Sequence, residues 1–336
     1  MGLQVKGRNT IQDFGISRGQ VVLSCCNDYS IDNIIKILQT SLDYFGGIGK
    51  FISSGDKVLI KPNLLKGVSP DACVTTHPAV IEAIVRIVLD YGGHPFIGDS
   101  PAFGDLSSVA VSTGMADICK QYSIPLTPFN SPVIVAVPDN MVRRIAIDRA
   151  ALEADKIINV PKLKTHVQVG FTGGVKNLFG SVVGKRKAMW HFRAGDRDHI
   201  FGKMLLEVYK ILNPSLHIID GIIALEGNGP AKGNPRQLGL LGLSGDALSL
   251  DRVLCDIINI PVSSVEIFCA LKRHFNLEVD IREIDIKGSP VSSFTGKKFV
   301  LPERMPIRFD LPRIMLSVLK HLKHKLTGAK TRMEHI

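Results

Sequence analysis

The densest group of residues able to do chemistry lies between residues 159 and 191. Lys162, Lys164 and His166 follow directly on a short apolar run there. Lysine ammonium groups neutralise phosphate or carboxylate, and a histidine can transfer a proton near neutral pH or bind a metal ion. The sequence therefore predicts an anion-binding site in this segment.

A glycine pair, Gly173 and Gly174, precedes Lys176 and Asn177 in the same segment. Glycine lets the backbone approach a ligand closely, and backbone N–H groups at the start of a helix attract anions. We therefore expect all four residues to contact the anion. The spacing matches neither G-x-x-x-x-G-K-[ST] nor G-x-G-x-x-G, the usual nucleotide-binding patterns.

His191 lies at the end of this segment, one residue after Trp190. With His166 it is a candidate proton carrier or metal ligand, and Lys176 is the third candidate catalytic residue. A zinc site usually needs three or four close ligands, and no HExxH or Cys/His set is present. The cofactor is therefore left open, with a metal ion on His166 and His191 as one alternative.

Polar residues also end other apolar runs. Lys61 and Asn63 follow one run, Asp99 and Ser100 follow another, and Asp220 ends a third. Ligands of open α/β sheets bind beyond the carboxyl ends of the strands. We expect one crevice, with Lys61, Asn63, Asp99 and Ser100 on one side and the lysine-rich segment on the other.

Short β-rich runs and helical patterns alternate along the chain, which is typical of an α/β fold. These are the elements that would position the residues above. We predict a mostly parallel sheet flanked by helices, in a single domain over residues 1–300, with a basic tail over 301–336. The predicted strands cover 21–26, 57–62, 95–100, 156–163, 216–222 and 237–246, with a late, antiparallel strand over 279–286. The predicted helices cover 31–44, 78–91, 107–121, 202–212, 247–258 and 262–275. The Gly/Pro-rich stretch 227–236 is either a lid over the crevice or a plain surface loop.

The net charge of +10 is concentrated in two segments. Residues 156–203 carry ten Lys/Arg against two acidic residues, and residues 301–336 carry eight against three. The tail includes a basic amphipathic helical pattern over 311–326. That helix could fold back on its own domain, lie on an anionic membrane surface, or dock an acidic partner.

The remaining composition narrows the class of protein. Six cysteines without a CxxC pair favour reduced thiols and a cytoplasmic location, and no iron–sulfur motif is present. No apolar run of membrane-spanning length is present, and the N-terminus lacks the apolar core of a signal peptide. Nucleic-acid binding is not expected, because aromatic residues make up 6% and no recognised motif occurs.

Several longer pieces resemble the family known as domain of unknown function 362. They include VLIKPNL, IGDSPAFG, ADKIINVPKLKTH, FTGGVKNLFGSVVGKRKAMWH and IIDGIIALEGNGP, in this order. The resemblance implies a cytoplasmic bacterial or archaeal protein with no settled role. Many members continue into a ferredoxin-like cluster-binding region whose cysteines this sequence lacks, so we expect any cluster to reside on a separate ferredoxin-like partner.

The run HVQVGFTGGVK is also similar to a stretch of the nickel-pincer lactate racemases. That resemblance implies that Lys176 matches the lysine that tethers the pincer, His166 a proton-transfer histidine and His191 the metal histidine. Where that family has its other proton-transfer histidine, this chain has Gly98-Asp99-Ser100. The departure implies a shared fold with altered chemistry.

Three functional hypotheses follow. The first is an enzyme or cofactor-handling protein that binds a small anionic molecule in the crevice. The second is a metal-dependent redox protein that works with a ferredoxin-like partner. The third is a polyanion-binding module, which the excess of basic residues allows.

Overall fold

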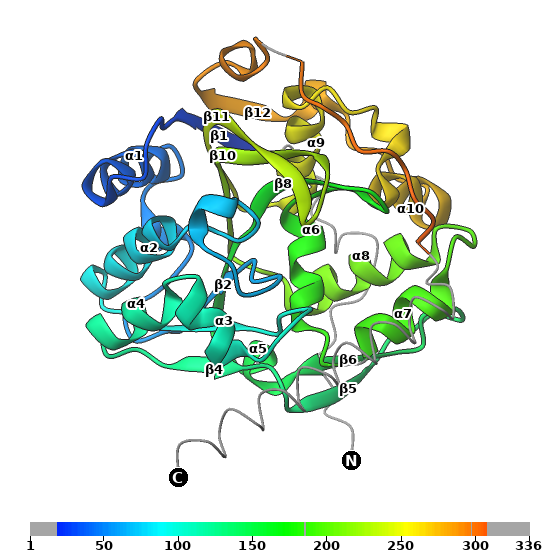
Figure 1. The fold of residues 1–336 in the computed structure, drawn as a ribbon, viewed down its shortest axis with the longest axis horizontal. Coiled ribbons are helices and arrows are strands. Elements are labelled where there is room, and N and C mark those ends of the chain that lie inside the picture. Colours follow the sequence, from blue (N-terminus) through cyan, green and yellow to red (C-terminus); the bar gives the residue numbers. More distant parts are fainter. Residues whose placement is uncertain (1–18, 185, 297, 308–336) are drawn as a thin grey trace, which may run out of the picture.

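The structure is a computed structural model that describes residues 19–184, 186–296 and 298–307. Within these residues a ten-stranded sheet forms the centre of the fold (Figure 1). Its strands are β1 (Gln20–Cys25), β2 (Lys57–Pro62), β3 (His94–Asp99), β4 (Leu126–Pro128), β7 (Lys156–Val160), β8 (Lys162–His166), β9 (Gly170–Thr172), β10 (Leu216–Asn228), β11 (Lys232–Ser244) and β12 (Asp285–Gly288).

The strand order is β12-β1-β11-β10-β7-β2-β3-β4, with β8 paired to β10 and β9 paired to β8. Most neighbouring strands run parallel, including β10–β7, β7–β2, β2–β3 and β3–β4. Only three pairs of this sheet are antiparallel in the described chain: β1–β11, β10–β11 and β8–β9. The predicted α/β class with a mostly parallel sheet is confirmed.

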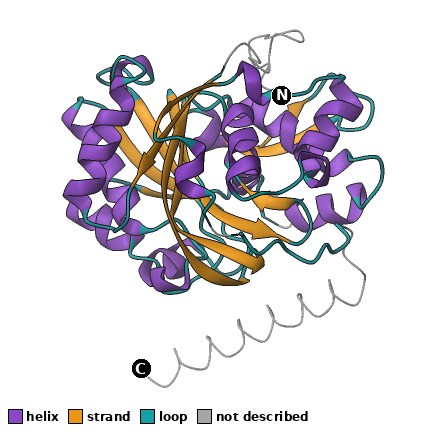
Figure 2. Cartoon of the chain, turned by 90° about the horizontal axis from the view of Figure 1, so that it is seen from above, coloured by secondary structure: helices purple, strands orange, loops and turns teal. Residues whose placement is uncertain are grey.

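Helices cover both faces of the sheet (Figures 1 and 2). One layer holds α1 (Ile31–Asp43), α2 (Pro78–Asp90), α3 (Leu106–Ser112) and α4 (Met115–Gln121). The other holds α6 (Gly174–Asn177), α8 (Ile200–Leu212), α9 (Ala247–Ile257) and α10 (Glu266–Phe275). A small hairpin of β5 (Pro132–Ala136) and β6 (Arg144–Asp148) lies at one end, together with α5 (Arg149–Leu152) and α7 (Arg186–Ala194).

Two apolar cores result, because side chains alternate between the two faces of a strand. In β1, Val21 and Leu23 pack with α8–α10 while Val22 packs with α1 and α2. Strands that are buried on both faces are continuously apolar, which explains runs such as VVL and VLI in the sequence. The sheet is thus packed on both faces, between two helical layers.

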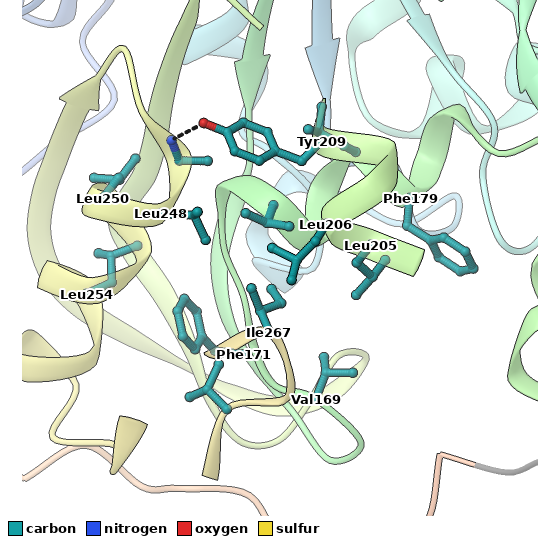
Figure 3. Close-up of a cluster of buried hydrophobic side chains, with 14 of the residues drawn as sticks. Val169, Phe171, Phe179, Leu205, Leu206, Tyr209, Leu248, Leu250, Leu254 and Ile267 are labelled. Atoms are coloured by element: carbon teal, nitrogen blue, oxygen red, sulfur yellow. Dashed lines mark hydrogen bonds between the residues drawn. The ribbon is translucent and has the colours of Figure 1, made fainter. Parts of the chain in front are cut away.

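The core around α8 and α9 is shown in Figure 3, where Leu205 and Leu206 face Leu248 across the cluster. The dashed line in Figure 3 marks a hydrogen bond in this core: the Tyr209 hydroxyl accepts it from the Ala247 amide at 3.2 Å. The same hydroxyl donates to Asp246 at 2.8 Å. Asp246 also caps α9, as its position before the helical pattern predicts.

Several expected elements differ in detail. The strand expected over 156–163 is interrupted at Pro161, and β8 continues after it, also parallel to β10. The helix expected over 107–121 is two helices that meet at Gly114, whose φ of 77° breaks the first one. Both breaks occur at residues whose backbone cannot continue the regular element.

Two predictions for the C-terminal half of the domain were wrong: the structure of residues 227–236 and the direction of the last strand. The stretch 227–236 is neither lid nor plain loop, because β10 continues to Asn228 and β11 starts at Lys232. The last strand covers Asp285–Gly288 and runs parallel to β1, not antiparallel. Residues 281–283 form a short helical turn instead, since Asp280 accepts a hydrogen bond from the Arg282 amide.

Residues 300–307 run along the domain beyond the boundary expected at residue 300. The Met305 amide donates to the Val167 carbonyl at 2.8 Å, and the Ile307 amide donates to Asp196 at 2.7 Å. The amphipathic helix expected over 311–326 lies outside the described residues. Among those that are described, none of the helices is long and apolar enough to cross a membrane.

Candidate functional site

The carboxyl ends of neighbouring strands bring the expected polar residues together. In the register of the sheet, Lys61 of β2 lies beside Asn159 of β7. Asp99 is the last residue of β3, the neighbour of β2 on its other side. Asp220 of β10 lies beside Lys162 of β8. Residues distant in sequence therefore share one edge of the sheet.

Lys61 and Asp99 form a buried ion pair. The Lys61 Nζ atom lies 2.9 Å from Asp99 Oδ1. The Asp99 carboxylate also accepts hydrogen bonds from the amides of Leu64 at 3.0 Å and Ser100 at 2.9 Å. The charge of Lys61, which we expected to neutralise a ligand, is already balanced within the protein.

Lys162 is balanced in the same way by Asp220. Its Nζ atom lies 2.9 Å from Asp220 Oδ2 and 2.8 Å from the Tyr29 hydroxyl. Tyr29 in turn donates to Asp220 at 3.0 Å and stacks on the ring of His77. The Asp220 carboxylate accepts a third hydrogen bond, from the His77 amide at 2.9 Å. This network holds the start of α2 and the segment after β1 against β10.

A chain of side-chain amides connects Lys164 to the interior. The Lys164 Nζ atom donates to Asn63 Oδ1 and to the Val74 carbonyl, both at 2.6 Å. Asn63 donates to Asn177 at 2.7 Å, and Asn177 donates to Asn159 at 2.8 Å. Asn159 Nδ2 lies 3.0 Å from the ring nitrogen Nδ1 of His217. The ammonium group of Lys164 is thus fixed in position by neutral oxygen atoms alone.

The glycine pair is held by a carboxylate that we did not expect. The Gly174 amide donates to Asp251 Oδ1 at 2.6 Å, and the Val175 amide donates to Oδ2 at 3.2 Å. A Cβ atom on Gly173 would lie 2.1 Å from Asp251 Oδ1, so only glycine fits there. Burial raises the pKa of Asp251 to about 7. The backbone N–H groups that we expected to face an anion are therefore occupied by Asp251 of α9.

Lys176 and Lys187 complete the group of lysines. The Lys176 Nζ atom lies over the ring of Phe179, 4.8 Å from its centre, and has no hydrogen bond or ion pair to any residue that the structure describes. Lys187 of α7 donates to the backbone carbonyl of Ser100. Burial, with the nearby charge of Lys61, lowers the pKa of Lys176 to about 8. Burial lowers the pKa of Lys187 to about 7.

Both candidate histidines are buried and uncharged. Burial and the charge of Lys176 lower the pKa of His166 well below its ordinary value and that of His191 to about 3. His166 Nδ1 accepts a hydrogen bond from the Gln168 amide at 3.2 Å, so its proton is on Nε2. His191 Nδ1 lies 3.3 Å from the Ile307 carbonyl, which can only accept, so its proton is on Nδ1. The two rings therefore hold opposite tautomers.

The resemblance to the pincer racemases does not extend to the whole site. At the position of the missing proton-transfer histidine the carboxylate of Asp99 is engaged by Lys61 and two amides. Within the described ranges, no three His, Cys, Asp or Glu side chains are grouped as a metal ion would need. The engaged Asp99 departs from the racemase pattern, and a metal ion on His166 and His191 stays a prediction, as does the match of Lys176 to the tethering lysine.

Sequence reasoning did not assign a role to Lys187, Asp251 or Tyr29. Lys187 stands four residues before His191, and that spacing places both on one face of a helix, which is the signal that could have found it. Tyr29 and Asp251 lie far along the chain from the residues they contact and carry no local signal. Of the expected residues, Lys61, Asn63, Asp99, Lys164, Lys176 and Asn177 lie at the same strand edge, while Lys162 belongs to the network of Asp220.

Three comparisons with known proteins place the chain. The family model described as domain of unknown function 362 matches residues 58–256. A thylakoid-associated protein of Synechocystis sp. is 40% identical over 294 residues, which is 87% of this chain and 91% of that protein.

The apoprotein structure of lactate racemase from Thermoanaerobacterium thermosaccharolyticum superposes with a TM-score of 0.45 at 12% identity. That alignment covers 79% of this chain and 61% of the racemase chain. The extent of the family match and the identity to the Synechocystis protein give one assignment: the chain belongs to the family of the domain of unknown function 362.

Proposed function

We propose that this site binds a small anionic molecule among Lys164, Lys176 and Lys187. The observation that carries the proposal is that Lys164 is buried, Lys176 and Lys187 are partly buried, and the amino groups of all three contact no carboxylate of the described chain. Placing a charge in the protein interior without a counterion is costly. A bound anion would offset that cost and draw the lysines to itself.

We further propose that His166 and His191 transfer a proton to or from the bound molecule. Their opposite tautomers give one ring with an Nε2–H donor and one with an Nε2 lone pair, which suits a paired general acid and general base. The lysines around them would stabilise negative charge that develops on the substrate. This supports an enzyme that moves a proton on an anionic substrate.

The test is a binding screen of phosphorylated and carboxylated metabolites on the natively purified protein, followed by isothermal titration calorimetry. His166→Ala and Lys176→Ala should keep the far-UV circular dichroism of the wild type but lose binding. Lys120→Ala, at an exposed position in α4, serves as the control and should bind normally. Wild-type affinity in both site variants would refute the assignment.

Two other hypotheses give different results with the same protein. A stoichiometric metal ion found by elemental analysis after anaerobic purification would favour the redox hypothesis, in which His166 and His191 hold the metal. Nucleic-acid binding that weakens steeply with salt would favour the polyanion-binding module.

We also propose a cytoplasmic location, with contact to a membrane surface through residues 311–326. The name of the Synechocystis relative, a thylakoid-associated protein, supports such a contact. Cell fractionation checks this: the protein should be found in the cytoplasmic and membrane-surface fractions, and high salt should release it from membranes.

A further inference from the structure

We infer that the molecule bound at this site carries at least two negative charges, as a phosphate monoester or a dicarboxylate does. The inference rests on the proposed anion site and specifies its ligand. It follows from how the lysines and carboxylates of the site are paired.

The site and the adjoining network of Asp220 hold five lysines and two carboxylates, apart from Asp251, whose carboxylate accepts hydrogen bonds from the Gly174 and Val175 amides. Each carboxylate is used by one lysine: Asp99 by Lys61 and Asp220 by Lys162, both at 2.9 Å. The remaining lysines are Lys164, Lys176 and Lys187. These three have no acidic partner among the described residues.

The contacts of the three are all with uncharged groups. Lys164 donates to Asn63 and to a backbone carbonyl, and Lys187 donates to the carbonyl of Ser100. Lys176 lies on the ring of Phe179. Neutral oxygens and a ring face orient an ammonium group, but they do not cancel its charge.

The three lysines come from different elements that meet at the site. Lys164 is on β8, Lys176 on α6 and Lys187 on α7. Lys164 donates to Asn63, and Asn63 donates to Asn177, the residue that follows Lys176. Lys187 donates to the carbonyl of Ser100, the residue that follows Asp99. An anion placed at Lys176 would therefore favour the protonated form of all three lysines.

The histidines do not change this balance, because His166 and His191 are uncharged in this environment. When all three lysines are protonated around the ligand, a singly charged ligand leaves two ammonium groups without a counterion in the same region. A ligand with two charges leaves at most one. The strand edge thus favours a dianion over a monoanion by electrostatics alone.

Matched probes test this on the full chain. Sulfate and methyl sulfate share their shape but differ by one charge, and malonate and monomethyl malonate form a second such pair. Titration calorimetry at pH 8 should show at least one dianion binding roughly tenfold or more tightly than its own monoester. The sulfate and malonate arms distinguish a tetrahedral from a dicarboxylate ligand.

The possible failures are distinguishable. Equal affinity within both pairs would overturn the dianion inference and leave the anion site intact. If none of the four probes and none of the screened metabolites bound, the proposed function itself would fail, and this inference with it.

Lys187→Gln should reduce the preference for the dianion, while Lys120→Gln should keep it; circular dichroism confirms that both are folded.

A second experiment uses the wild-type protein alone. Lys176 and Lys187, which face Lys61, Lys164, Asp99 and the two histidines, are partly deprotonated at pH 8 without ligand. Dianion binding should therefore take up protons, which appears as different binding enthalpies in Tris and triethanolamine. Identical enthalpies would contradict the inference.

Discussion

Replacing Asp220 by Asn should destabilise the protein strongly. The Asp220 carboxylate is fully buried and accepts hydrogen bonds from Lys162, Tyr29 and the His77 amide. Asparagine retains one oxygen and turns a donor toward groups that also donate, and it leaves the Lys162 ammonium without a counterion. Removing one partner of a buried ion pair costs about 3–5 kcal/mol. That is about a fifth or more of the ~5–15 kcal/mol by which such proteins are stable.

Urea unfolding, followed by far-UV circular dichroism and by Trp190 fluorescence, measures this loss as a lower midpoint. Combining Asp220→Asn with Lys162→Met removes the unpaired ammonium, so the double variant should be more stable than Asp220→Asn alone. Glu278→Gln is the control, because Glu278 pairs with Lys272 on the surface with both side chains largely exposed. A midpoint for Asp220→Asn equal to that of Glu278→Gln, or no gain from the second substitution, would refute the reasoning.

Two further predictions concern stability. Gly173→Ala places a Cβ atom against Asp251 and should lower the thermal midpoint by the equivalent of about 1–3 kcal/mol of stability. Gly296→Ala is the control: the space around its added Cβ atom is open, so the thermal midpoint should not change. A midpoint for Gly173→Ala like that of Gly296→Ala would show that the turn can shift. Without ligand, the thermal midpoint should rise as the pH increases from 7 toward 10. In the folded protein the pKa of Lys187 is about 7 and that of Lys176 about 8, whereas an unfolded lysine has a pKa near 10.5. The unfolded chain therefore binds more protons than the folded protein in this range, and stability increases with pH. Lys187→Met should reduce the rise, and the same slope in this variant would exclude Lys187 as its source.

The sequence predicts the place of the site well because that place depends on local pattern. Each of Lys61, Asp99 and Asn159 stands at the end of an apolar run, and parallel neighbouring strands end at the same edge. The alternation of strands and helices is enough to predict that sheet. The residues at its edge follow without knowledge of any side-chain contact.

The pairing of charges could not be predicted in the same way. Lys61 and Lys176 look alike in sequence, yet one has a carboxylate at 2.9 Å and the other has none. Which lysine is balanced depends on side-chain positions set by packing between segments far apart in the chain. Asp251 shows the same limit: it lies on the inner face of α9 and acts on a turn 77 residues earlier.

The position of β1 also bears on how the protein is made. This strand lies between β11 and β12, and the Ser244 hydroxyl donates a hydrogen bond to the Gln20 carbonyl, 224 residues earlier in the sequence. During synthesis, β1 leaves the ribosome with neither neighbour yet available. At usual elongation rates it waits roughly 10 to 45 seconds for β11. An apolar strand with unpaired edges over that time is a natural site for a chaperone to bind, and for a nascent chain to aggregate when chaperones are scarce.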